Sequence, residues 1–211
     1  PEATALVDIA LDGTVGREWN YRQLLETSER LAGVLVSRFA PGERVVVWAP
    51  NIPEWLFLEY ACAFSGLVLV TANPSFQEKE LRYVLEQSGA VALFLVDSFR
   101  GNAMADIAQK AIEGNGQIRE VVNLEDETVL FKQGSKLADL PGVKPTDPAQ
   151  IQYTSGTTGF PKGAVLSHYN LVNNARLFAA RKKVHQQSVW ANFMPMFHTA
   201  GCATSALGSL Q

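Results

Sequence analysis

The segment Tyr153–Gly163 (YTSGTTGFPKG) concentrates hydroxyl groups, glycines and one lysine within eleven residues. Its three glycines permit backbone angles that other residues avoid, so successive N–H groups can point into one concavity that binds anions. The hydroxyls add donors that rotate to suit a ligand, and the lysine adds a compact positive charge. The segment therefore predicts a cradle for phosphate oxygens. Its members are Thr154, Ser155, Gly156, Thr157, Thr158, Gly159, Lys162 and Gly163.

This segment differs from the P-loop of nucleoside triphosphatases. In a P-loop, Gly-Lys is followed by Ser or Thr and a helix begins at once. Here Pro161 precedes Lys162, Gly163 follows it, and the chain enters a second strand-like run, AVLS. A plain Gly/Ser/Thr-rich surface turn is the simpler alternative. The order of hydroxyls and glycines with a Pro-Lys-Gly end favours phosphate binding over that turn.

The segments that must position this loop alternate between helical and strand patterns. Buried strands are expected at 44–49, 67–71 and 90–96, with a weaker one at 118–124. Helices are expected at 20–39, 51–65, 75–88, 102–113 and from 168 onward, with Asn20, Asn51, Ser75 and Ser167 as their N-caps. The repetition predicts an α/β fold whose parallel-rich sheet is flanked by helices. Residues 139–150, rich in proline, are expected to form a linker.

Composition and charge exclude several protein classes. The 211 residues are 47% hydrophobic, enough for one sizeable core, and no apolar run is long enough to span a bilayer. No Cys or His residues stand at zinc-ligand spacing, and Cys62 and Cys202 are expected to be buried thiols, with a disulfide left open. With no signal peptide visible, a reducing, cytoplasmic location is expected.

The acidic residues are unevenly distributed. All 21 precede residue 151, whereas 151–211 carries five Lys or Arg residues and all three histidines. Around a loop rich in hydroxyls and glycines, this excess of positive charge predicts an anionic small-molecule ligand. Nucleic acid is not expected as a partner, and the oligomeric state stays open.

Several stretches resemble the adenylate-forming (AMP-binding) enzymes, which include acyl- and aryl-CoA synthetases, peptide-synthetase adenylation domains and luciferases. YTSGTTGFPKGAVLSHYNL is similar to their phosphate-binding signature, and MPMFHTAG (194–201) is similar to their next motif. WNYRQL and GLVLVTANPSFQEKELRYVLEQSGA resemble upstream segments, and GAVLSHYNLVNN is most similar to medium- and long-chain fatty acyl-CoA synthetases. The resemblance implies that residues 1–211 form an incomplete N-terminal domain of the adenylate-forming fold.

The resemblance also implies a reaction and roles for particular residues. A carboxylic acid and ATP would give an acyl-adenylate and pyrophosphate, and coenzyme A would then take the acyl group. Lys162 would bind the β- and γ-phosphates, and Thr154 would help to hold Mg²⁺. His198 would lie beside the reacting carboxylate, with Phe197 in the substrate pocket. Two alternatives stay open. His198 would then be a packed or hydrogen-bonded structural residue, and Phe197 would pack in the core.

The residue types suit this chemistry. A fatty acid is already ionised at neutral pH, because carboxyl pKa values lie near ~4, so no general base is needed. Donors and cations suffice to bring two anions together and to stabilise the leaving pyrophosphate.

Residues 151–211 contain no Asp or Glu, so this segment lacks carboxylates that a nucleotide site would use. In the family, the carboxylates for magnesium and ribose and a second lysine come from later segments. We therefore expect the complete protein to be an acyl-CoA synthetase and the 211-residue chain alone to be inactive. Two alternatives remain: a nucleotide- or phosphate-binding module without catalysis, and an adenylating enzyme for aromatic or amino acids.

Overall fold

A six-stranded sheet forms the centre of the computed structural model, which describes residues 1–10, 12–130, 140–154 and 161–211. The strand order is β6-β5-β3-β4-β7-β8, and every neighbouring pair is parallel except the antiparallel pair of β7 and β8. The bounds are β3 Arg44–Trp48, β4 Val68–Thr71, β5 Ala92–Leu95, β6 Glu120–Asn123, β7 Pro148–Thr154 and β8 Lys162–Ser167. The predicted parallel-rich α/β sheet is confirmed.

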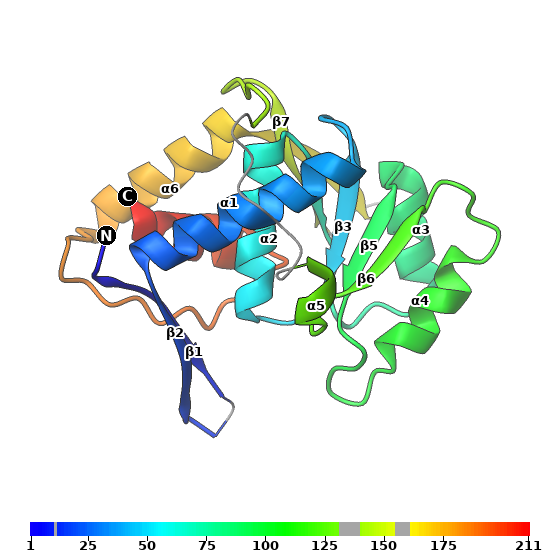
Figure 1. The fold of residues 1–211 in the computed structure, drawn as a ribbon, viewed down its shortest axis with the longest axis horizontal. Coiled ribbons are helices and arrows are strands. Elements are labelled where there is room, and N and C mark those ends of the chain that lie inside the picture. The colour runs from blue at the N-terminus through cyan, green and yellow to red at the C-terminus, as the bar shows by residue number, and fades with distance from the viewer. Residues whose placement is uncertain (11, 131–139, 155–160) are drawn as a thin grey trace.

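Helices cover both faces of this sheet, as Figure 1 shows, with α1 and α2 on one side of β3, β5 and β6 and with α3 and α4 on the other. The short helix α5 follows β6, and α6 follows β8 and contacts the C-terminal helices η1 and η2. Their bounds are α1 Tyr21–Arg38, α2 Pro53–Ser65, α3 Glu78–Ser88, α4 Met104–Ile112, α5 Glu127–Leu130, α6 His168–Lys182, η1 Ala200–Leu207 and η2 Gly208–Leu210.

The core lies between these layers. Every residue of β4 and β5 is buried, which explains why their sequences are apolar apart from Thr71. The largest fully buried side chains include Trp48, Trp55 and Phe94. Cys62 and Cys202 are also buried and both are free thiols, so no disulfide joins them.

Two of the expected helix caps are confirmed. Asn20 caps α1 in a capping box with Gln23, and Ser167 caps α6 in a capping box with Asn170. The Ser167 cap matters most for the site, because it fixes where the chain leaves β8 and turns into α6.

The expected caps Asn51 and Ser75 are wrong. Helix α2 begins at Pro53 with Ile52 as its N-cap, because proline tolerates the first helical position, where an N–H would have no partner. The side chain of Asn51 instead bonds to the backbone around residue 195. Helix α3 begins at Glu78, and its N-cap is Gln77, two residues later than expected, in a capping box with Glu80.

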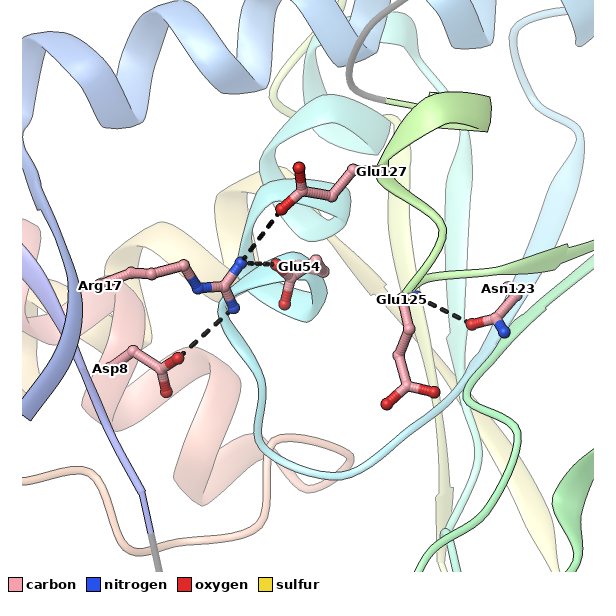
Figure 2. Close-up of polar contacts among 6 residues, drawn as sticks. All are labelled: Asp8, Arg17, Glu54, Asn123, Glu125 and Glu127. Carbon is pink, nitrogen blue, oxygen red and sulfur yellow. Dashed lines mark hydrogen bonds and ion pairs between the residues drawn. The ribbon is translucent and has the colours of Figure 1, made fainter. Parts of the chain in front are cut away.

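The N-terminal hairpin of β1 (Thr4–Ile9) and β2 (Val15–Asn20) is not among the predicted elements, and it projects from the body in Figure 1. Arg17 of this hairpin binds Glu54 at the start of α2, with N–O 2.5 Å. Asp8 and Glu127 lie within ion-pairing distance of the same guanidinium, as Figure 2 shows. The Glu54 hydrogen bond is the main cause of a raised pKa of Arg17. This arginine therefore fastens the hairpin to the body.

The stretch 139–150, expected to be a linker, is partly in the sheet. Strand β7 begins at Pro148, so the last residues of the stretch expected as a linker belong to the central sheet. No helix within the described ranges is both long and apolar enough to cross a membrane.

Candidate functional site

The predicted phosphate cradle lies at the turn between β7 and β8, at one edge of the sheet. The two strands are antiparallel, and Thr154 pairs with Lys162 where the loop leaves the sheet. The expectation that the loop joins two strands is confirmed. The predicted members Ser155, Gly156, Thr157, Thr158 and Gly159 lie outside the described residues. The structure thus places Thr154 and Lys162 opposite each other at the two ends of the loop.

Helix α3 supports the base of this hairpin. The Tyr83 hydroxyl donates to the Pro161 carbonyl oxygen at 3.0 Å, and the Tyr153 hydroxyl donates to the Gln87 side chain. The two tyrosine rings meet edge to face, with centroids 6.4 Å apart. Burial raises the pKa of Tyr153 to about 12, so this hydroxyl stays a neutral donor at physiological pH. The residue that precedes Lys162 is therefore held against a rigid helix.

Gly163 has a different role from the one expected. It is a strand residue without a positive φ, so it does not add a special backbone angle to the cradle. A Cβ at this position would lie 2.9 Å from Ile151 Cγ2 and 3.3 Å from the Tyr153 ring. Glycine is needed here because its neighbours in β7 pack directly against its backbone.

Lys162 is exposed, and no ion pair among the described residues involves it. The chain from residue 151 onward contains no carboxylate that could neutralise it locally. An ammonium group at the mouth of such a hairpin is suited to bind an anionic ligand.

The second predicted motif forms a tight turn at residues 194–198. The His198 backbone N–H donates to Pro195 O at 3.1 Å, and the exposed His198 ring accepts a hydrogen bond at Nδ1 from Ala200 N at 3.1 Å. In the neutral ring the proton therefore sits on Nε2, which is left to donate outward. Phe197 is half-buried, whereas Met196 is a core residue with 5% exposure.

Gly201 allows this turn to fold back on the start of η1. A Cβ at Gly201 would overlap the Pro195 carbonyl oxygen and would lie 2.8 Å from Met194 O. No other residue would fit without moving the backbone of the turn. The glycine in MPMFHTAG is thus explained by close packing.

A buried chain of polar side chains connects the two motifs. Gln150 Nε2 donates to Glu59 Oε1 at 3.1 Å, and Gln152 Nε2 donates to Gln150 Oε1 at 3.0 Å and to Cys202 Sγ at 3.3 Å. Cys202 Sγ in turn donates to His198 O at 3.4 Å. Burial raises the pKa of Glu59 to about 8, so this carboxyl is protonated at neutral pH.

The alternation of side chains along β7 shows which face of the strand Thr154 occupies. Gln150, Gln152 and Thr154 occupy alternate positions, so they share one face of the strand. Because the two glutamines on this face contact Cys202 and Glu59, Thr154 lies on the face that leads toward the His198 turn. Thr154 therefore shares the face of β7 that packs, through Gln152, against Cys202 just after the His198 turn.

Comparison with known proteins now decides the family. A family model described as AMP-binding enzyme matches residues 1–211. The chain belongs to the AMP-binding enzyme family. The mitochondrial medium-chain acyl-CoA ligase ACSF2 of Homo sapiens is 31% identical over 242 residues, which cover 98% of this chain and 38% of that protein. The chain spans little more than a third of the length of the curated relatives it matches.

Solved structures of AMP-binding enzymes share the fold. ATP-bound MatB from Rhodopseudomonas palustris superposes with a TM-score of 0.81 at 25% identity, covering 100% of this chain and 41% of that one. The N-terminal domain of FACL13 from Mycobacterium tuberculosis gives a TM-score of 0.73 at 28% identity, covering 92% of this chain and 48% of that one.

The described residues offer few ligands for a metal ion. The described part of the chain contains no group of three or more His, Cys, Asp or Glu residues that could hold a metal ion. The Thr154 hydroxyl is a single oxygen donor at the exposed end of β7. A lone hydroxyl fits Mg²⁺ that is held mainly by phosphate oxygens and water, and does not fit an all-protein metal site.

Sequence reasoning missed the residues that connect the motifs. Glu59, Gln150 and Gln152 are polar residues that stand in buried segments. A strand with glutamines on one face breaks the apolar pattern of its neighbours, and that break was the available signal. Asn51 stands just before a helix, which predicts a cap, but its side chain binds the backbone of residues 194 and 196 instead.

Proposed function

We propose that the complete protein carrying this chain is an acyl-CoA synthetase. It would activate a carboxylic acid with ATP to an acyl-adenylate and pyrophosphate, and then form the coenzyme A thioester. The observation that supports this most is the hairpin that pairs Thr154 with Lys162, which is exposed and forms no ion pair within the described part of the chain, in an AMP-binding enzyme domain. The relatives that carry acyl-CoA ligase names support the same assignment.

Each step gives the residues of this chain a defined task. A carboxylate oxygen attacks the α-phosphorus of ATP, the bond between the α-phosphorus and the bridging oxygen breaks, and the electron pair leaves with pyrophosphate. Lys162 would bind the β- and γ-phosphates and offset the charge that develops there. The amides and hydroxyls of residues 154–159 would hold the same phosphates.

His198 would act as a donor beside the reacting carboxylate. Its Nδ1 accepts from the Ala200 N–H, so the neutral ring has Nε2–H available and would donate it to the carboxylate. A donor there would hold the carboxylate in line with the α-phosphorus, because positioning is a large part of catalysis when two anions must meet. Phe197, next to it and half-buried, would contribute to the pocket for the acid.

Mg²⁺ would arrive bound to the phosphates of ATP, with Thr154 as its one ligand from this chain. When bound, the ion would neutralise phosphate charge.

The proposal is tested by pyrophosphate release from the complete protein with ATP, magnesium and a panel of acids. Alkanoates of medium and long chain are expected to give the fastest release, followed by thioester formation when coenzyme A is added. A panel in which benzoates or amino acids exceed every alkanoate would replace the fatty-acid assignment. If the complete protein binds nucleotide but releases no pyrophosphate with any acid, the assignment as a nucleotide-binding module without catalysis would be favoured instead.

A further inference from the structure

The side chain of Asn51 joins two parts of the molecule that are far apart in sequence. Its Nδ2 donates to Met194 O at 2.8 Å, and its Oδ1 accepts from Met196 N at 2.8 Å. The amide thus pairs with the backbone on both sides of Pro195, as a neighbouring strand would. Asn51 itself is an exposed residue of the loop between β3 and α2, three residues after the end of the buried strand β3.

The rest of the turn is fixed from the interior. Pro195 O accepts from His198 N at 3.1 Å, and His198 O accepts from Cys202 N at 3.2 Å and from its thiol at 3.4 Å. The thiol is bound to Gln152, two residues before Thr154. The turn is therefore held at its outer side by Asn51 and at its inner side by the strand that leads to the loop.

These contacts make the position of His198 depend on Asn51. Met196 is buried, but Met194 and Pro195 are exposed, so burial of apolar side chains does little to hold these two residues in place. If the two amide bonds were lost, this backbone could move away from the β3–α2 loop. The hydrogen bond from His198 N to Pro195 O would move with it.

We propose that Asn51 is a positioning residue that clamps the 194–196 backbone and so sets the place and orientation of the His198 ring relative to Thr154 at the end of β7. The catalytic consequence rests on the proposed function, in which His198 contacts the reacting carboxylate. The conformational part of the proposal does not depend on that function.

The conformational part is tested on the 211-residue chain by long-range ¹H–¹⁵N NMR of its histidine side chains. At about pH 7.5, where imidazoles are mainly neutral, His198 should show one Nε2–H tautomer. We expect Asn51→Ala to give averaged nitrogen shifts for His198 while His168 and His185 stay unchanged. Asn51→Asp, which keeps the acceptor but loses the donor, should be intermediate. Asn174→Ala, at an exposed asparagine of α6, is the matched control.

An unchanged His198 spectrum in folded Asn51→Ala would overturn the proposal. If that variant does not fold, Asn51→Asp provides the test. A wild-type His198 spectrum in Asn51→Asp would show that the hydrogen bond from Asn51 to Met194 O does not position the ring, and would overturn the proposal. A collapse of all three histidine signals would also count against it, since a general structural role would then explain the effect.

The catalytic part is tested in the complete protein by a double-mutant cycle with pyrophosphate release. Asn51→Ala should lower kcat by about 10- to 100-fold, the cost expected of a misplaced group, with KM for ATP nearly unchanged. In a His198→Ala background the same change should have almost no further effect. Multiplicative losses in the double variant would refute action through His198. A wild-type protein that releases no pyrophosphate with any acid would end the proposed function, and the NMR result would still decide the role of Asn51.

Discussion

Replacing Glu59 by glutamine should make the protein more stable at alkaline pH. The carboxyl is buried, and one of its oxygens accepts from Gln150 while the other has no partner among the described residues. Burial raises the pKa of Glu59 from the ordinary 4.5 to about 8. The side chain is therefore neutral in the folded protein at neutral pH, whereas it is ionised in the unfolded chain.

The direction of the pH effect follows from proton binding. Between pH 4.5 and about 8 the folded state holds a proton that the unfolded state has lost, so the free energy of unfolding falls as pH rises through this window. At about 1.4 kcal/mol per pKa unit, the full loss is on the order of 5 kcal/mol. Glutamine is neutral in both states and lacks this slope. The two proteins should be similar near pH 5, and the variant should be more stable near pH 8.

The assay is urea unfolding of the 211-residue chain across this pH range, with the difference between wild type and Glu59→Gln plotted against pH. The difference removes the effect of other titrating groups, such as His168, whose pKa burial lowers. Exposed Glu86→Gln is the matched control and should follow wild type. Parallel curves for wild type and Glu59→Gln would show that the carboxyl is not held in its neutral form, and would refute this reasoning.

Three further substitutions test other parts of the structure. Gly201→Ala should cost about 1–3 kcal/mol, because its Cβ would overlap the Pro195 carbonyl; a urea midpoint equal to wild type would contradict the packing described. Arg17→Met should cost about 1–2 kcal/mol by leaving the buried Glu54 carboxylate without its cation, a value reduced because Arg17 is 47% exposed; an unchanged midpoint would show that the hairpin is held otherwise. In the complete protein, Lys162→Ala should slow adenylation by about 2–3 kcal/mol of transition-state free energy; unchanged adenylation with slower thioester formation would reassign this lysine.

The elements were predictable where the sequence pattern is local. Continuous apolar runs identify β4 and β5, and the capping box of Ser167 identifies the start of α6. The β1–β2 hairpin had a weaker signal. Asp12-Gly13 is a turn pair, with Gly13 at φ 85° and Asp12 accepting from Thr14 N, but the flanking strands are mostly exposed and lack a clear alternation.

The candidate site was predictable in its chemistry but not in its connections. The loop and His198 were found from residue types and resemblance, and their roles remain predictions. Asn51 was assigned to the nearest helix because capping is a local rule, whereas its partners are more than 140 residues away. Only the folded chain brings Met194 and Met196 to that asparagine. Long-range pairing of this kind leaves no periodic trace in a single sequence.

The unequal pairing of β7 and β8 has a consequence for the order in which these strands leave the sheet. Strand β7 is hydrogen-bonded on both sides, to β4 and to β8, whereas β8 lies at the end of the sheet with a largely exposed pattern. Local fraying at such an edge requires less free energy than unfolding the interior. Unfolding that starts at this edge would release β8 first, while residues 150–152 of β7 keep their bonds to β4.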